Sequence, residues 1–109
     1  MGLYYKSTRN SNLKVTASEA ILKGLAPDGG LFVPSELPKL DVTMSDLKGK
    51  TYQEIADLVM KQFLTDFTEE ELKNCIDKAY DSKFDTEEIA PLVKVDDTYY
   101  MELFHGATI

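Results

Sequence analysis

The sequence predicts an α+β fold in which several short helices pack on a small sheet. Threonines followed three residues later by an acidic residue recur along the chain, and this pattern marks helix starts. Apolar residues at helical spacing follow these threonines. Runs rich in aromatic and β-branched residues, "LYYKST" near the start and "TYYMELF" near the end, favour strands. A chain of 109 residues is the size of one compact domain, so we expect a single core.

The first predicted helix covers residues 17–23. Thr16 and Glu19 form the pattern of a capping box at its start, and Gly24 is expected to end it in a left-handed conformation. The stretch "PDGG" at 27–30 then predicts a turn, because proline presets the first turn angle and glycine supplies a positive φ. A strand is expected at the apolar triplet 31–33. Two prolines interrupt residues 34–40, which are therefore predicted as a loop.

Two longer helices are predicted to pack as a hairpin. The first covers residues 52–64 and begins after Thr51, and the second begins after Thr68. Their apolar faces, predicted as core, consist of Tyr52, Ile55, Ala56, Val59 and Phe63 on the first helix and Leu72, Cys75, Ile76 and Ala79 on the second. On such a face we expect Cys75 to be a small buried hydrophobe.

The last part of the chain is predicted to form two strands. A single helical turn at 86–89 is expected to end before Pro91, because the residue ahead of a proline is disfavoured in the α region. Strands at 92–95 and 98–104 follow, joined by a turn at Asp96 and Asp97. The strand-forming run at the N-terminus is available as a further partner.

Composition narrows the possible functions. The net charge of -7 opposes binding to nucleic acid, and no long apolar run indicates a membrane partner. The N-terminus lacks the apolar core of a secretory signal, and the lone Cys75 excludes an internal disulfide, so we expect a cytoplasmic protein. His105 is the only histidine, which excludes a metal centre of several histidines within the chain. The acidic run at 69–71 is interpreted as complementing a helix dipole rather than binding a cation.

Two local features each leave two interpretations open. His105 follows a predicted strand, where it either packs the loop or lines a site. The "STRN" stretch at 7–10 groups hydroxyls, a guanidinium and an amide, which either bind an anion or form a turn. The residues alone thus provide for a fold but not for a reaction.

Three stretches in the same order, "YKSTRN" at 5–10, "GLAPDGGLFVP" at 24–34 and "ELFHGAT" at 102–108, resemble the N-terminal region of threonine synthase. The last is the most specific. In that family Leu-Phe-His-Gly, a small residue or proline, and threonine run into Ala-Phe-Lys-Asp, whose lysine carries pyridoxal phosphate. That lysine is expected three residues beyond Ile109.

The resemblance implies the N-terminal domain of a fold-type II pyridoxal phosphate enzyme, which converts O-phosphohomoserine and water to threonine and phosphate. Residues 1–95 are then expected to form this domain, and residues 96–109 the first strand and turn leading into the catalytic domain. His105, Gly106 and Thr108 match the family turn, which makes them candidates for lining the site. The resemblance places no catalytic residue in this chain, and no cofactor is expected to bind to it alone.

Two readings of function remain. In the first, the chain is an inert segment of threonine synthase whose partners are its own catalytic domain and, in the whole enzyme, the small-molecule substrate. In the second, it is a stand-alone, non-catalytic protein-interaction domain. Residues 99–104 are apolar on both faces of the predicted strand, so we also expect an incompletely covered strand that promotes self-association.

Overall fold

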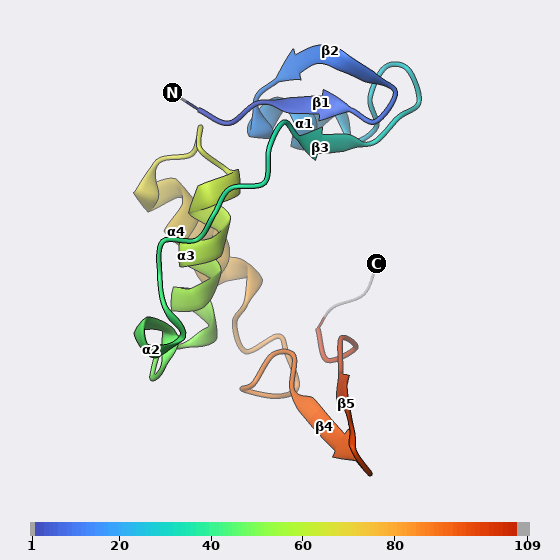
Figure 1. Cartoon of the computed structure of the whole chain (residues 1–109). Coiled ribbons are helices and arrows are strands. Elements are labelled where there is room, and N and C mark those ends of the chain that lie inside the picture. The colour runs from blue at the N-terminus through green and yellow to red at the C-terminus, as the bar shows by residue number, and fades with distance from the viewer. Residues whose placement is uncertain (1, 107–109) are drawn as a thin grey trace.

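The computed structural model describes residues 2–106 and has a mixed architecture of helices and two small antiparallel sheets (Figure 1). Its elements are β1 (Tyr5–Ser7), β2 (Asn10–Val15), α1 (Ala17–Lys23), β3 (Phe32–Pro34), α2 (Met44–Leu47), α3 (Tyr52–Phe63), α4 (Glu69–Ala79), β4 (Leu92–Val95) and β5 (Thr98–Met101). The predicted α+β class is confirmed. None of the helices in the described part of the chain is long and apolar enough to cross a membrane.

The expectation of a single core is wrong. The radius of gyration is 16.3 Å, whereas a compact chain of this length has about 13 Å. The two sheets lie at opposite ends of the pair formed by α3 and α4 (Figure 1). Buried apolar side chains form one group around the first sheet and α1, and further ones lie on α4 and in the loop that follows it. The chain is therefore an open arrangement of three small units.

The first sheet has the strand order β2-β1-β3. Tyr5 lies opposite Val15 on one side and Pro34 on the other, so that β1 is paired along both edges. The N-terminal run thus pairs with its sequence neighbours and not with β4 or β5. Sequence reasoning missed β2, because its residues "NSNLKV" are mostly polar and only Val15 is buried.

Each helix begins after a threonine that forms a capping box. The boxes predicted at Thr16, Thr51 and Thr68 are confirmed, with each side chain accepting a hydrogen bond from the backbone three residues on. Gly24 ends α1 with a positive φ of 76°, but its ψ of -88° is not that of the left-handed helical cap that was expected. The same signature at Thr43 starts the four-residue α2, which sequence reasoning did not identify.

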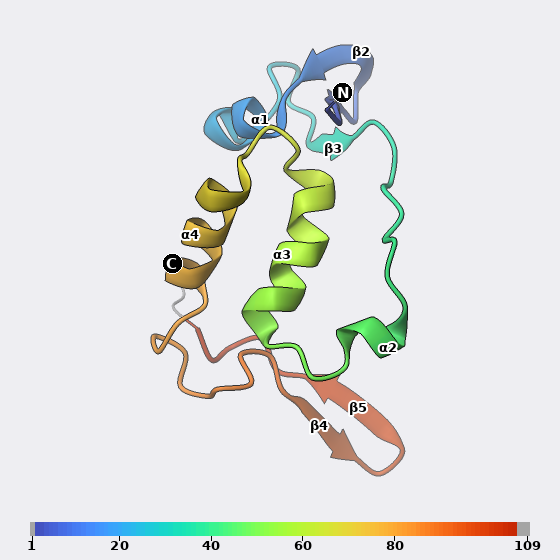
Figure 2. The same cartoon turned by 90° about the vertical axis from the view of Figure 1, so that its left-hand side faces the viewer.

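The helices α3 and α4 lie side by side as the predicted hairpin (Figure 2). Leu72 and Ile76 are buried, but Cys75 and Ala79 are exposed, which corrects the predicted apolar face of α4. The reason is that the buried residues recur every four positions, so that this row faces α3 while the flanking positions have no covering neighbour. The face of α3 predicted as core is only partly covered, and none of its residues is buried.

The chain after α4 differs from the prediction at two points. Residues 86–89 form a turn and not a helix, and Ile89 has φ 64° with its side chain 5 % exposed. The strand predicted to reach residue 104 ends at Met101, which pairs with Leu92. Because Pro91 precedes Leu92 and has no N–H, it only accepts a hydrogen bond from the Glu102 N–H at 2.9 Å, and the ladder stops there.

Candidate functional site

His105 lies between two carboxylates. Its Nδ1 faces the carboxylate of Asp85, and its Nε2 is 2.8 Å from Oε1 of Glu102. The ring also stacks on Phe104 with 4.5 Å between ring centroids, and the side chain is 15 % exposed. Asp85 comes from the loop after α4, so this contact joins segments twenty residues apart.

The two carboxylates favour the charged imidazole. An ionised carboxylate only accepts hydrogen bonds, so this arrangement favours an imidazole that donates from both ring nitrogens. The hydrogen bond with Glu102 raises the pKa of His105, partial desolvation opposes this, and the hydrogen bond and charge of Asp85 raise it further. With both nitrogens engaged inside the chain, the contacts are those of a residue that packs the loop.

Gly106 lies directly against the ring of Phe84. A Cβ added to Gly106 would come 2.5 Å from Cε2 of Phe84, closer than any normal contact. The backbone N–H of Asp85 also donates to the carbonyl of His105 at 3.1 Å. His105 and Gly106 therefore both pack against the loop that follows α4. Thr108, the third candidate, lies outside the described residues.

The "STRN" stretch forms a turn network. Ser7 is 2 % exposed, and its hydroxyl donates to Oδ1 of Asp28 at 2.6 Å. Gly30 N–H donates to the same carboxylate at 2.9 Å, and the Arg9 guanidinium donates to the Asp28 carbonyl at 3.0 Å. The hydrogen bond from Ser7, followed by that from Gly30, lowers the pKa of Asp28. The anion that Ser7 and Gly30 hold is thus a carboxylate of the chain itself, and Arg9 holds the neighbouring carbonyl, which agrees with the turn interpretation.

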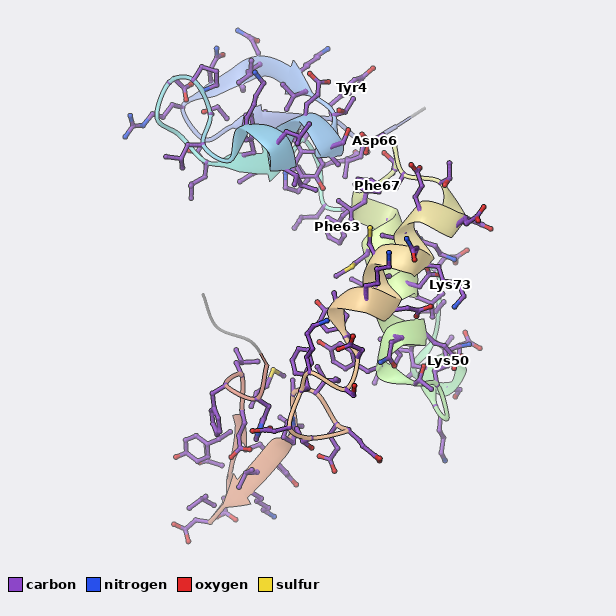
Figure 3. All side chains as sticks on the ribbon, turned by 180° about the vertical axis from the view of Figure 1, so that it is seen from behind. Tyr4, Lys50, Phe63, Asp66, Phe67 and Lys73 are labelled. Atoms are coloured by element: carbon purple, nitrogen blue, oxygen red, sulfur yellow. The ribbon has the colours of Figure 1, made fainter. Side chains whose placement is uncertain are left out.

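A second polar cluster joins the first sheet to the helix pair. Figure 3 shows Asp66 in the loop between α3 and α4, close to the first sheet. Its carboxylate accepts hydrogen bonds from the N–H and the hydroxyl of Ser18, at the start of α1. Tyr5 OH donates to the carbonyl of Phe63 at 2.8 Å. Partial desolvation raises the pKa of Asp66, but the hydrogen bonds from Ser18 lower it more.

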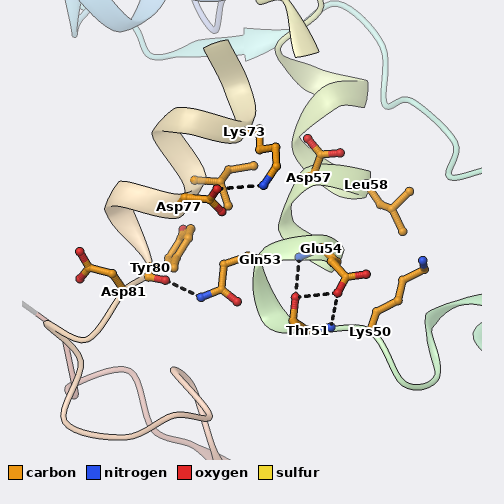
Figure 4. Close-up of a pocket in the computed structure, with 11 residues that line it drawn as sticks. Lys50, Thr51, Gln53, Glu54, Asp57, Leu58, Lys73, Asp77, Tyr80 and Asp81 are labelled. Carbon is orange, nitrogen blue, oxygen red and sulfur yellow. Dashed lines mark hydrogen bonds and ion pairs between the residues drawn. The ribbon is translucent and has the colours of Figure 1, made fainter. Parts of the chain in front are cut away.

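A cavity between α3 and α4 has a volume of about 660 Å³ (Figure 4). One of its two lysines, Lys73, is paired with Asp77 at 2.9 Å. Its charged lining consists of Lys50, Glu54, Asp57, Lys73, Asp77 and Asp81. The four carboxylates outnumber the lysines, which disfavours an anionic ligand. Within residues 2–106, no group of three or more His, Cys, Asp or Glu side chains is arranged to hold a metal ion.

Comparison with known proteins identifies the family. Residues 4–80 match the family model described as threonine synthase N terminus. The chain belongs to the threonine synthase family. It is 41% identical to threonine synthase of Schizosaccharomyces pombe, in a match that covers 95% of this chain and 21% of that protein. With human threonine synthase-like 1 it shares 40% identity over 84% of this chain and 13% of that protein.

Solved threonine synthases have the same arrangement. The pyridoxal phosphate-bound threonine synthase of Brucella melitensis matches with a TM-score of 0.82 and 33% identity, over 97% of this chain and 23% of that one. The yeast threonine synthase matches with a TM-score of 0.80 and 34% identity, over 94% and 22%. The chain thus spans less than a quarter of the length of these relatives.

Sequence reasoning missed the residues that surround the family turn. It found His105 and Gly106 through the "LFHG" motif, but not Phe84 and Asp85, which lie in a loop without any periodic pattern. Glu102 was placed on a strand and not at the imidazole. The one available signal was the single histidine next to an acidic residue three positions earlier, which does not identify a partner twenty residues away.

Proposed function

We propose that this chain is the N-terminal segment of a threonine synthase, which converts O-phosphohomoserine and water to threonine and phosphate, and that the segment alone is inactive. One observation carries the proposal. Alignment with threonine synthases covers 95% of the chain but only 21% or 22% of the relatives' length. This coverage supports a chain that corresponds to one end of the enzyme.

The lining of the cavity between α3 and α4 does not favour pyridoxal phosphate. This cavity carries four carboxylates against two lysines, and its Lys73 is already paired with Asp77. A phosphate monoester there would meet net repulsion. We propose that the cofactor and the substrate are held by a catalytic domain formed by further chain, and that this segment contributes the candidates His105, Gly106 and Thr108 near the site.

The role of the segment is to support and present the family turn. Its proposed partner is its own catalytic domain, and the division of the chain after Val95 remains a prediction. The hairpin of β4 and β5 straddles that point, because Val95 pairs with Thr98. Residues 96–106 would then belong with the catalytic domain. The cytosolic location also remains a prediction from composition.

The test compares the complete reading frame with the 109-residue chain. Both proteins are assayed for phosphate release from O-phosphohomoserine in the presence of pyridoxal phosphate, and each is reduced with borohydride to locate modified lysines. We expect turnover and one modified lysine in the longer protein, and diffuse labelling without turnover in the shorter one. A natural chain that stops after Ile109 would overturn the proposal in favour of a stand-alone interaction domain. Turnover by the 109-residue chain, with one stoichiometrically modified lysine, would overturn its inactivity.

The 109-residue chain is also proposed to self-associate through its second sheet. Tyr99 is 62% exposed and Tyr100, on the opposite face, is 55% exposed, so both faces of β5 present aromatic surface to water. Light scattering behind a sizing column should show a concentration-dependent dimer or larger species. The variant Tyr99→Thr/Tyr100→Thr should be mainly monomeric. The control Leu22→Thr, which removes an 88% exposed side chain from α1, should still associate. A wild-type chain that stays monomeric at high concentration would contradict this.

A further inference from the structure

The loop after α4 contacts the family turn at three points. The Asp85 N–H donates to the His105 carbonyl at 3.1 Å, and the Asp85 carboxylate faces Nδ1 of the same residue. The Phe84 ring occupies the space where a Cβ of Gly106 would stand. These contacts fix both the backbone and the one side chain at the start of the turn.

We propose that Phe84 and Asp85 are positioning residues for the turn, with Asp85 and Glu102 holding the His105 imidazole by both nitrogens while Phe84 sets the path of the backbone at Gly106. This rests on the proposed function only where it concerns catalysis. The contacts themselves belong to residues 84–106 and are testable in the chain alone.

The geometry gives His105 a holding role and not a proton-transfer role. A general base needs a nitrogen lone pair directed at its substrate, and here each nitrogen is directed at a carboxylate. The stacked Phe104 ring restricts the imidazole further. A side chain held at both nitrogens and on one face has little freedom to rotate, which suits a residue that fixes the start of a turn.

Deprotonation of His105 should weaken its contacts with Asp85 and Glu102. The charged groups that face the imidazole within the described residues are Asp85 and Glu102, and the packed ring of Phe104 carries no charge. Because the pKa of His105 is raised above its ordinary value of 6.5, the stabilisation is complete below pH 6.5. It is lost as the pH rises through the raised pKa. The protection factor of the Asp85 amide, which corrects for the intrinsic rise of exchange with pH, should therefore fall as the pH rises through that pKa.

The first experiment titrates His105 by NMR. It is the only histidine of the 109-residue chain, so its ring protons are unambiguous. Glu102→Gln and Asp85→Asn should each lower its pKa, Glu102→Gln by more, and the double variant should lower it furthest. Asp97→Asn, in the hairpin turn, is the matched control and should leave the titration unchanged. A pKa of His105 that changes in neither Asp85→Asn nor Glu102→Gln would overturn the proposal that these two carboxylates hold the imidazole.

The second experiment tests positioning in the full-length enzyme. Gly106→Ala should clash with Phe84 and lower kcat/KM on the order of 10²-fold, the usual effect of a misplaced active-site group. Adding Phe84→Ala, which removes the clashing ring, should restore most of the lost kcat/KM. Rescue separates positioning from a general loss of stability, because removal of a second packed side chain would otherwise lower activity further. Absence of rescue, with both variants folded by circular dichroism, would overturn the proposal.

Proton transfer by His105 is tested in the same enzyme. His105→Gln keeps a hydrogen-bonding side chain but cannot carry a proton, so under a holding role we expect it to lower kcat while leaving measurable turnover. Complete loss of turnover in a folded His105→Gln enzyme would overturn the holding role. A full-length protein without activity would refute the proposed function. The NMR titration would still show whether Asp85 and Glu102 hold the imidazole of His105.

Discussion

The part of the chain that the family model matches, residues 4–80, differs sharply from residues 81–106 in how it is stabilised. All but one of the buried apolar side chains in the described part of the chain lie in the first region, and Ile89 is the exception. In β4 and β5, by contrast, every residue is exposed. The first region therefore contains its own small cores, and the second contains almost none.

The difference shows which strands have backbone partners on both edges. The central strand β1 is paired on both edges, and the turn beside it is closed by the hydrogen bonds around Asp28. The strands β4 and β5 pair only with each other. A two-stranded hairpin in water is at best marginally stable, so β4 and β5 need cover from another surface. That requirement agrees with a chain that spans less than a quarter of its relatives.

The largest effect expected on this comparison is at Ile76. Its side chain is 2 % exposed, and Ile76→Ala should lower the free energy of unfolding by about 3 kcal/mol through lost burial and a new cavity. Leu103→Ala is the matched control, because Leu103 is 75% exposed, and it should cost less than about 0.5 kcal/mol. Urea unfolding followed by circular dichroism measures both. Equal losses would show that the hairpin region is as well packed as the helices.

Patterns among residues close in sequence predicted most of the helices of the first region. Threonine and acid pairs placed the helices because a capping box is built from neighbouring residues, as at Thr16 and Thr68. The prediction failed where long-range contacts decide. Cys75 is exposed because α4 has a neighbour on one side only, and nothing local specifies that. Strand β2 has a polar sequence and is held in place by β1.

The candidate site was predicted only in part, for the same reason. The motif around His105 identified the turn, yet the groups that hold it, Phe84 and Asp85, come from a separate loop. Only residues 86–89 of that loop were given a predicted structure, a single helical turn, which the chain does not form. Within it, Ile89 has a positive φ and a buried side chain. No short-range pattern in the sequence predicts such a contact.

A smaller effect is expected at the start of α4. The Thr68 hydroxyl accepts a hydrogen bond from the Glu71 N–H at 3.1 Å, and the Glu71 carboxylate accepts one from the Thr68 N–H at 2.9 Å. Thr68→Ala should therefore destabilise the chain by about 1 kcal/mol in a thermal melt. Thr98→Ala, at an exposed position of β5, is the control in the second region and should change the midpoint less. An unchanged midpoint for Thr68→Ala would mean that the cap does not limit the stability of the first region.

The smallest effect concerns the junction at Asp66, and it depends on pH. The carboxylate accepts two hydrogen bonds from Ser18, and its pKa is lowered from 3.8 in the folded chain. A lowered pKa stabilises the fold above the ordinary value of 3.8, and this contribution is lost as the pH falls through the lowered pKa. Asp66→Asn keeps an oxygen acceptor but removes the charge. At pH 7 it should cost less than about 1 kcal/mol, because Asp66 is exposed and water screens its charge.

Melts at pH 7, 5 and 3 should therefore show a difference between wild type and Asp66→Asn that persists at pH 5 and shrinks at pH 3. Asp41→Asn, an exposed carboxylate in the loop before α2, controls for the change in net charge. If the difference were the same at all three pH values, the carboxylate charge would not join α1 to the helix pair. The first region would then be stabilised by its apolar contacts and neutral hydrogen bonds alone. Its stability would differ from that of the hairpin only through the burial of apolar side chains.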